Sequence, residues 1–129
     1  MERSLRKVIQ DVPIGKLLIQ TDPHTNEPQL HYCKLPADIA SRQVILMDAT
    51  IATGAAVIMA IRVLMEHSVP EDQIKVVCLV GAPQGVVAAA SMFPRVVFIV
   101  GEIDWAGLSE QYWILPGVGN FGDRYFGTD

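Results

Sequence analysis

The chain has 129 residues, half of them apolar, and its formal net charge at pH 7 is −4. This length is enough for one domain with one core, and the apolar content argues against intrinsic disorder. The acidic balance and the lack of a basic patch argue against nucleic acid as a partner, although backbone amides can still bind a small anion. With no signal peptide and no apolar run of transmembrane length, we expect a cytoplasmic protein without a membrane partner.

The N-terminal part of the chain is predicted to form a helix and then a β-hairpin. Apolar residues recur at helical spacing over residues 2–12. Two strand-like runs, 16–20 and 29–35, flank a stretch rich in turn formers, so residues 16–35 are expected to form a hairpin with a wide tip. One short helical turn is expected within 36–42.

Strands and helices alternate through the rest of the chain. Continuous apolar runs occupy 43–48, 74–80 and 95–100, and helices are expected between them at 54–67 and 86–92. Strands of this kind are typical of a parallel sheet that is buried on both faces and joined by right-handed crossovers. The sequence therefore predicts an α/β fold, with a parallel sheet flanked by helices and a β-hairpin arm.

The C-terminal segment is less regular. Asp104 and Trp105 follow the third apolar run, and Trp105 is expected to pack against the fold. Residues 112–115, YWIL, predict a last short strand. The sequence PGVGNFGD at 116–123 predicts a glycine-rich loop, which is either a simple connection or a ligand-binding loop.

The stretch VILMDATIATGAAV at 44–57 leaves a buried strand through a carboxylate and enters a helix through small residues. Ligands of open α/β sheets bind beyond the carboxyl ends of the strands. Small residues let backbone N–H groups approach an anion at the helix N-terminus, and Thr50 and Thr53 add hydroxyl donors. Asp48 would repel phosphate, so it is better suited to ribose hydroxyls. The alternative is that Thr53 only caps the helix and Asp48 is only a polar strand end.

These residues carry a resemblance to a known family. VILMDATIATGAAV resembles the phosphoribosyl-pyrophosphate loop of type I phosphoribosyltransferases, and YWILPGVGNFGDRYFGTD resembles the uracil-binding C-terminus of uracil phosphoribosyltransferases. IGKLLIQTD, EPQLHYCKLP and GAPQGV fit the same family in the same order, so the resemblance covers nearly the whole chain. The chain is also similar to the C-terminal domain of uridine kinase-like proteins.

The resemblance implies a type I phosphoribosyltransferase fold and a pyrimidine-salvage activity, in which uracil and phosphoribosyl pyrophosphate give UMP and pyrophosphate. It implies that Asp48 and Asn120 are the catalytic residues. It assigns phosphoribosyl pyrophosphate binding to Asp48, Ala49, Thr50, Ile51, Ala52, Thr53, Gly54, Ala55, Ala56 and Asn120. It assigns uracil binding to Ile114, Gly119, Asn120 and Phe121. Mg²⁺ is expected to bind through the substrate's phosphates, with no metal site in the protein itself. A homo-oligomer is a further expectation, with regulation by GTP as in some members.

The chain also departs from the family pattern. Residues 53–56 are Thr-Gly-Ala-Ala where the family usually has Thr-Gly-Gly-Ser, and Asn120 replaces an acid of many active members. Active members often have an arginine near the position of Thr21 that reaches pyrophosphate, and Thr21 cannot replace its charge. The family's Arg-Ala-Gly pyrophosphate loop and the strand before it would lie upstream of Met1. Residues 1–129 are therefore expected to be an N-terminally truncated, C-terminal part of a larger domain. A second hypothesis stays open, in which the domain keeps the fold but acts in nucleotide binding, regulation or oligomerisation without catalysis.

Overall fold

The computed structural model describes residues 1–22, 24, 25 and 27–128. The helices and strands, in chain order, are α1 (Glu2–Val8), β1 (Lys16–Thr21), β2 (Pro28–Lys34), η1 (Ile39–Ser41), β3 (Val44–Ile51), α2 (Ala55–Glu66), η2 (Glu71–Gln73), β4 (Ile74–Gly81), α3 (Pro83–Met92), β5 (Val97–Ile103) and α4 (Phe121–Phe126). β1 and β2 form an antiparallel hairpin, and β3, β4 and β5 form a parallel sheet in that order. The predicted α/β class, the hairpin arm and the parallel sheet are confirmed.

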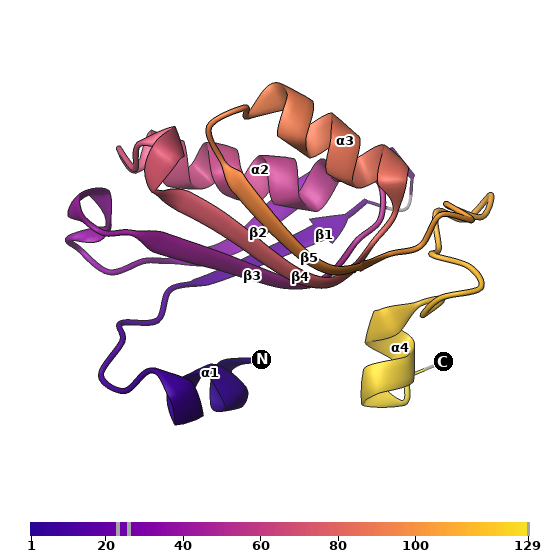
Figure 1. Cartoon of the computed structure of the whole chain (residues 1–129), viewed down its shortest axis with the longest axis horizontal. Coiled ribbons are helices and arrows are strands. Elements are labelled where there is room, and N and C mark those ends of the chain that lie inside the picture. Colours follow the sequence, from indigo (N-terminus) through magenta and orange to yellow (C-terminus); the bar gives the residue numbers. More distant parts are fainter. Residues whose placement is uncertain (23, 26, 129) are drawn as a thin grey trace.

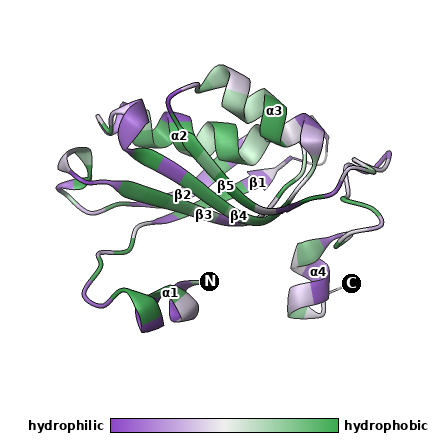
Figure 2. Cartoon of the chain, in the orientation of Figure 1, coloured by the Kyte–Doolittle hydropathy of each residue, from purple (hydrophilic) through white to green (hydrophobic). Residues whose placement is uncertain are grey.

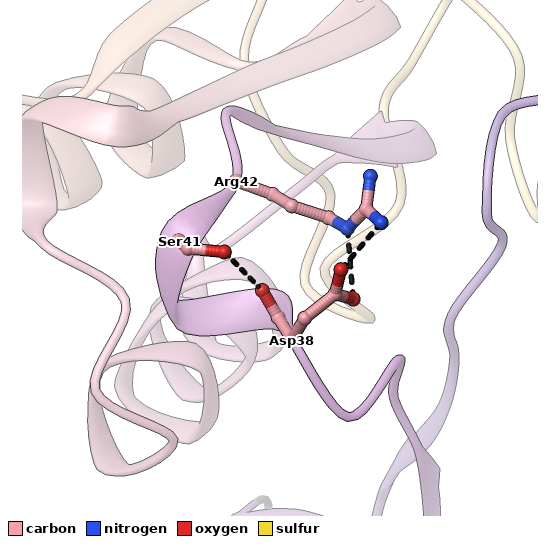
Figure 3. Close-up of polar contacts among 3 residues, drawn as sticks. All are labelled: Asp38, Ser41 and Arg42. Carbon is pink, nitrogen blue, oxygen red and sulfur yellow. Dashed lines mark hydrogen bonds and ion pairs between the residues drawn. The ribbon is translucent and has the colours of Figure 1, made fainter.

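Local interactions of exposed side chains hold the hairpin tip and the short helical turn. In the tip, Asp22 Oδ1 accepts hydrogen bonds from the backbone N–H groups of His24 and Thr25, at 2.7 and 3.1 Å. Two residues of the predicted tip, Pro23 and Asn26, lie outside the described residues. At η1, the Arg42 guanidinium donates to both carboxylate oxygens of Asp38, and Ser41 Oγ donates to the Asp38 carbonyl (Figure 3). This pairing lowers the pKa of Asp38 and raises that of Arg42.

The core lies between α2 and one face of the parallel sheet (Figure 1). From α2 it receives Val57, Ile61 and Leu64, which follow one another at helical spacing on a single side of the helix. From β4 it receives Ile74, Val76 and Cys78, which alternate as residues on one face of a strand do. Ile61, Ile74 and Val76 are fully buried, so this α2–β4 layer is the best-shielded part of the chain.

The opposite face of the sheet is open among the described residues, so the prediction of strands buried on both faces is wrong. Ile45, Leu79, Val97 and Ile99 are between 45% and 52% exposed. Figure 2 shows that the strands are strongly hydrophobic, whereas α2 and α3 cover only one side of them. α1 and α4 lie on the other side in Figure 1, but neither helix contains a buried residue. The apolar pattern indicates that both faces of the strands could be buried, but the described elements cover only one face.

The predicted N-terminal helix is shorter than expected. It ends at Val8, and Ile9 is already extended. Val8 itself is 83% exposed. A helix of seven residues without tertiary packing has little to hold its last turn, so the apolar spacing through residue 12 does not extend it.

The C-terminal segment also differs from its prediction. Residues 112–115 form no strand, and Ile114 makes only isolated bridges, to Leu108 and to Gly119. Tyr112 has a positive φ of 61°, and Pro116 lacks an N–H donor, so an extended ladder cannot form here. Part of the predicted loop is instead helix α4, which Asn120 caps at its N-terminus and Gly127, with a φ of 67°, ends.

No helix within the described part of the chain is both long and apolar enough to span a membrane.

The one-sided core makes a prediction about stability. Ile74→Ala is expected to lower the free energy of unfolding by about 3 kcal/mol, because it leaves a cavity in the core. Ile45→Ala, on the open face, is expected to lower it by about 1 kcal/mol or less. Urea unfolding followed by circular dichroism measures both values. Equal losses would contradict the one-sided core and indicate that the open face is covered in solution.

Candidate functional site

The candidate site lies at the carboxyl edge of the parallel sheet. β3, β4 and β5 end there at Ile51, Gly81 and Ile103. Two backbone hydrogen bonds join successive strand ends: Ala82 N–H donates to the Ile51 carbonyl at 2.8 Å, and Asp104 N–H donates to the Gly81 carbonyl at 2.9 Å. The start of α2, the start of α3 and the segment after β5 therefore meet at one edge, where ligands of such sheets bind.

The predicted phosphoribosyl segment divides into three parts. Asp48 to Ile51 belong to β3, which runs farther than the predicted end at 48, so Asp48 lies inside the strand rather than at its end. Only Ala52, Thr53 and Gly54 form a loop, and Ala55 and Ala56 are the first residues of α2. The Ile51 side chain is 2% exposed within the core. At this residue, only the backbone faces the edge.

The loop is pressed against the first turn of α3. Gly54 has a φ of 88°, which favours glycine, and a Cβ on Gly54 would lie 2.6 Å from the Gly85 carbonyl oxygen. A Cβ on Gly85 would lie 2.2 Å from the Ala52 carbonyl oxygen and 2.7 Å from the Gly54 nitrogen. The two glycines thus allow a backbone-to-backbone contact between the loop and α3. This contact gives a physical role to Gly85 of the GAPQG stretch, which the sequence pattern alone does not reveal.

The N-terminus of α2 has few local hydrogen-bond partners. Gly54, its N-cap residue, gives no side-chain cap, and Thr53 Oγ1 accepts from the Ala55 N–H at 3.3 Å. Among the described residues, the N–H groups of Ala56 and Val57 donate no hydrogen bond. Backbone donors at a helix N-terminus attract an anion through hydrogen bonding and the helix dipole. The alternative that Thr53 is the helix cap is wrong as stated, because the N-cap residue is Gly54, although the Thr53 hydroxyl still accepts from the first N–H of α2.

Asp48 lies beside Cys78, its register partner on β4. The Asp48 side chain keeps an exposed surface, but protein atoms around the carboxylate partly exclude water, and this desolvation raises its pKa. Hydrogen bonds from the N–H groups of Ala49 and Thr50 oppose that rise, the first at 2.7 Å. Burial, together with the Asp48 charge, raises the pKa of Cys78 to about 11, so the thiol is a neutral core residue.

The predicted base loop is a closed backbone unit. Ile114 is 1% exposed, and its carbonyl accepts from the Gly119 N–H at 2.9 Å. Arg124 Nη1 donates to the Val118 carbonyl at 3.1 Å. Phe121 stacks on Tyr125, with 5.5 Å between the ring centroids. Ile114, Gly119, Asn120 and Phe121, predicted to bind uracil, are thus brought into one local unit.

The two predicted catalytic residues are not brought into contact. Asn120 caps α4: its Oδ1 accepts from the Asp123 N–H at 3.4 Å, and its Nδ2 donates to Asp123 Oδ2. Within the described part of the chain, no hydrogen bond or ion pair joins residues 114–121 to residues 48–56. The loop at 52–54 and the loop before α4 lie at the same edge of the sheet, but the hydrogen bonds of the Asn120 side chain are made to Asp123 of α4.

Asp104 is the residue that ties the base loop to the sheet. Its Oδ2 accepts from the Gly117 N–H at 2.8 Å, and its Oδ1 accepts from the Ala106 N–H at 3.1 Å. The sequence offers one signal for this role, namely a carboxylate shortly after the third apolar run. The adjacent Trp105 is 81% exposed, so the expectation that it packs against the fold is wrong.

Two cavities lie away from this edge. One, of about 690 Å³, lies among the N-terminal segment, Ile39 and the first half of β3. Another, of about 530 Å³, lies between β2 and α2 and touches only Ala55 of the predicted site residues. Among the described residues, no group of three or more His, Cys, Asp or Glu side chains could hold a metal ion. The candidate site is an open edge that presents backbone donors and the carboxylates of Asp48 and Asp104.

Comparisons with known proteins agree along the whole chain. The sequence model of a family described as "Uracil phosphoribosyltransferase" matches residues 1–128. The chain is 54% identical over 129 residues to "Uridine-cytidine kinase-like 1" of Mus musculus, covering all of this chain and 23% of that protein. It is 47% identical over 129 residues to "Uracil phosphoribosyltransferase" of Dictyostelium discoideum, covering all of this chain and 59% of that protein.

A solved structure is similar in fold. It is described as "Structure of AQ2163 protein from Aquifex aeolicus", with a TM-score of 0.86, 27% identity, and coverage of the whole of this chain and 60% of that one. The chain thus spans between 23% and 60% of the length of these three proteins. The fold is that of a type I phosphoribosyltransferase, as the resemblance implies.

Because the loop packs closely against α3, we expect alanine to change the free energy of unfolding differently at two helical glycines, Gly85 and Gly122. Gly85→Ala is expected to lower the free energy of unfolding by about 2 kcal/mol, because the new Cβ overpacks the loop backbone. Gly122→Ala in α4 meets only an ordinary contact at 3.5 Å and is expected to be neutral, or stabilising by up to about 1 kcal/mol. Thermal and urea unfolding compare the two, and a stabilising Gly85→Ala would contradict the close contact.

A second prediction concerns Asp48 and pH. Its pKa is raised above 3.8 in the folded chain, so the folded state binds this proton more tightly than the unfolded state does. Stability conferred by the protonated form is present below that value and is lost as the pH rises through the folded pKa. Asp48→Asn, which keeps an acceptor for the Ala49 N–H, is therefore expected to be more stable than the wild type at neutral pH.

The difference between Asp48→Asn and the wild type should shrink as the pH falls to about 3. Urea unfolding at both pH values measures it, and Asp72→Asn at an exposed position is the matched control. A wild type more stable than Asp48→Asn at neutral pH would contradict the prediction.

Proposed function

Because the chain belongs to the uracil phosphoribosyltransferase family, we propose that it provides the nucleotide site of an enzyme that joins uracil to phosphoribosyl pyrophosphate. The products would be UMP and pyrophosphate. One observation carries the proposal: a helix N-terminus with free N–H groups and a loop closed by backbone hydrogen bonds lie at the same sheet edge. The first feature suits a phosphate, and the second suits a flat base with alternating donors and acceptors.

In the proposed complex, Thr53, Gly54, Ala55 and Ala56 bind the 5-phosphate through N–H groups and the Thr53 hydroxyl. Asp48 accepts hydrogen bonds from ribose hydroxyls. The backbone of Ile114 to Phe121 binds the edge of uracil. In the reaction, the bond between uracil N1 and the anomeric carbon forms, the bond from that carbon to pyrophosphate breaks, and the N1 proton leaves. The chain contributes mainly positioning and charge stabilisation.

Mg²⁺ would be held by the phosphate oxygens of the substrate and by water, as is usual for this ion. When bound, it supplies positive charge that helps pyrophosphate to leave. The residues at the edge fit this arrangement, because Asp48 is the carboxylate of the proposed phosphoribosyl segment and the other groups there are backbone N–H groups and hydroxyls.

A second candidate is a domain that binds nucleotide for regulation without catalysis. Two observations favour it. Ala55 and Ala56 offer no hydroxyl at the helix start, and the Asn120 side chain is already bonded to Asp123. The relatives include proteins named for uridine kinase-like as well as phosphoribosyltransferase activities, so the names alone do not choose between the two.

Calorimetric titration of the chain with UMP tests the proposal, with Ala56→Glu as the disrupting variant. A carboxylate in the first turn of α2 suits the helix dipole and should keep the fold, but it repels the phosphate. We expect saturable UMP binding by the wild type and its loss in Ala56→Glu. Ser91→Glu adds the same charge at the far end of α3 and should bind UMP as the wild type does.

UMP synthesis from uracil and phosphoribosyl pyrophosphate then separates the two candidates. Binding with synthesis supports the transferase. Binding without synthesis, in a longer protein that includes this chain, would favour the regulatory domain. No binding by a folded wild-type chain would contradict both.

A further inference from the structure

We propose that Asp104 is a positioning residue for base recognition, which sets the conformation of the loop that binds uracil without touching the nucleotide's phosphate. The inference rests on the proposed function, since it assigns the base to residues 114–121. It concerns a carboxylate that lies outside both predicted binding segments, one residue after the end of β5.

The parallel sheet fixes the position of Asp104. Its own N–H donates to the Gly81 carbonyl at 2.9 Å, so its backbone is fixed to the end of β4. Its side chain is only partly exposed. The carboxylate therefore projects from a point that the parallel sheet itself holds in place.

The Asp104 carboxylate accepts hydrogen bonds from two backbone N–H groups of the C-terminal segment. One oxygen accepts from Ala106 N–H at the start of the following segment, and the other accepts from Gly117 N–H, thirteen residues from Asp104 in sequence. Hydrogen bonds from N–H groups to a carboxylate are stronger than those between neutral groups. A single side chain thus clamps both ends of the segment that contains Ile114.

Among the described residues, the side chain of Asp104 makes the hydrogen bond that joins this unit to the end of the sheet. Within the described residues, the hydrogen bonds of 107–120 are otherwise made inside the C-terminal segment, as between Ser109 and Trp113 or between Gly119 and Ile114, apart from the bond of Gly107 N–H to the Asp104 carbonyl. Ile114 is buried, but it lies outside the main core cluster. Asp104 is accordingly the polar link that fixes this unit relative to the sheet.

Gly117 fits closely against the carboxylate. A Cβ on Gly117 would clash with Asp104 Oδ2, at 2.4 Å, and would lie 3.1 Å from Ile114 Cγ2. An alanine there must push away either the carboxylate or Ile114. Gly117→Ala therefore disturbs the same link from the opposite side.

The test compares UMP with ribose 5-phosphate, which contains the phosphate and ribose but no base. In Asp104→Asn, an NH₂ group replaces one carboxylate oxygen, so one of the two N–H groups loses its acceptor. We expect UMP to bind roughly ten-fold more weakly, the size of one charge-assisted hydrogen bond, while ribose 5-phosphate binds as before. Calorimetry measures UMP, and chemical-shift titration measures ribose 5-phosphate.

Two further variants keep the test decisive. Gly117→Ala should give the same selective loss, and the double variant should be little worse than either single one, because both remove a single link. Asp72→Asn is the matched control at an exposed position and should bind both ligands normally. Circular dichroism and thermal unfolding identify any variant that has lost the fold.

The outcomes separate this inference from the proposed function. Normal UMP affinity in folded Asp104→Asn would overturn the role of Asp104 and leave the nucleotide site in place. An equal loss of UMP and ribose 5-phosphate would also overturn it, because a general structural role predicts that result. Failure of the wild type to bind UMP would overturn the proposed function, and the inference with it.

Discussion

The close approach of Gly54 and Gly85 is the constraint on which the edge of the sheet depends. A parallel sheet alone places strand ends in a row, but it does not decide how near the following helices come to one another. A Cβ on Gly54 or on Gly85 would lie only 2.6 or 2.2 Å from a backbone oxygen of the other segment. Any other residue at either position would therefore force the loop away from α3. That approach holds Ala52 to Gly54 in a tight turn at the N-terminus of α2. Since the contact is made by backbone atoms, it fixes the loop without using a side chain that a ligand would need.

The two halves of the site are stabilised by different means. The proposed phosphate-binding half is continuous with the core, because Ile51 precedes the loop and Val57 follows it, and both are almost fully buried. Within the described residues, the proposed base-binding half has Ile114 as its buried anchor and is otherwise held by backbone bonds and by the side chains of Asp104 and Arg124. Its conformation therefore rests on a small number of polar interactions. A loop of this kind can be rigid when all of these bonds are present, and it changes readily when one is removed.

The sequence predicts the elements that depend on local pattern and misses those that depend on contacts between segments. Apolar alternation and helical spacing are local, which is why the hairpin, β4 and α2 lie close to their predicted bounds. The continuation of β3 through Asp48 to Ile51 depends on pairing with β4, and the loss of a strand at 112–115 depends on the conformation at Tyr112. The glycine-rich stretch also concealed α4, although Asn120 and Gly127 are a helix cap and a helix stop. The roles of Gly85 and Asp104 depend on partners far along the chain, so no window of sequence contains them.

The capping role of Asn120 bears on how the base loop can work. An asparagine N-cap contributes about 1 kcal/mol to a helix, and a new hydrogen bond from its amide to a ligand would contribute a similar amount. Exchanging one for the other gains little, and it would release a helix that holds Phe121 against Tyr125. The backbone of Gly119 to Phe121 has no such conflict, because its geometry depends on the cap remaining in place. In the proposed site, this favours recognition of the base by the backbone, with the Asn120 side chain keeping that backbone in position, over a direct catalytic role for the amide. An acid at the same position could also cap α4, so the cap alone does not require the asparagine.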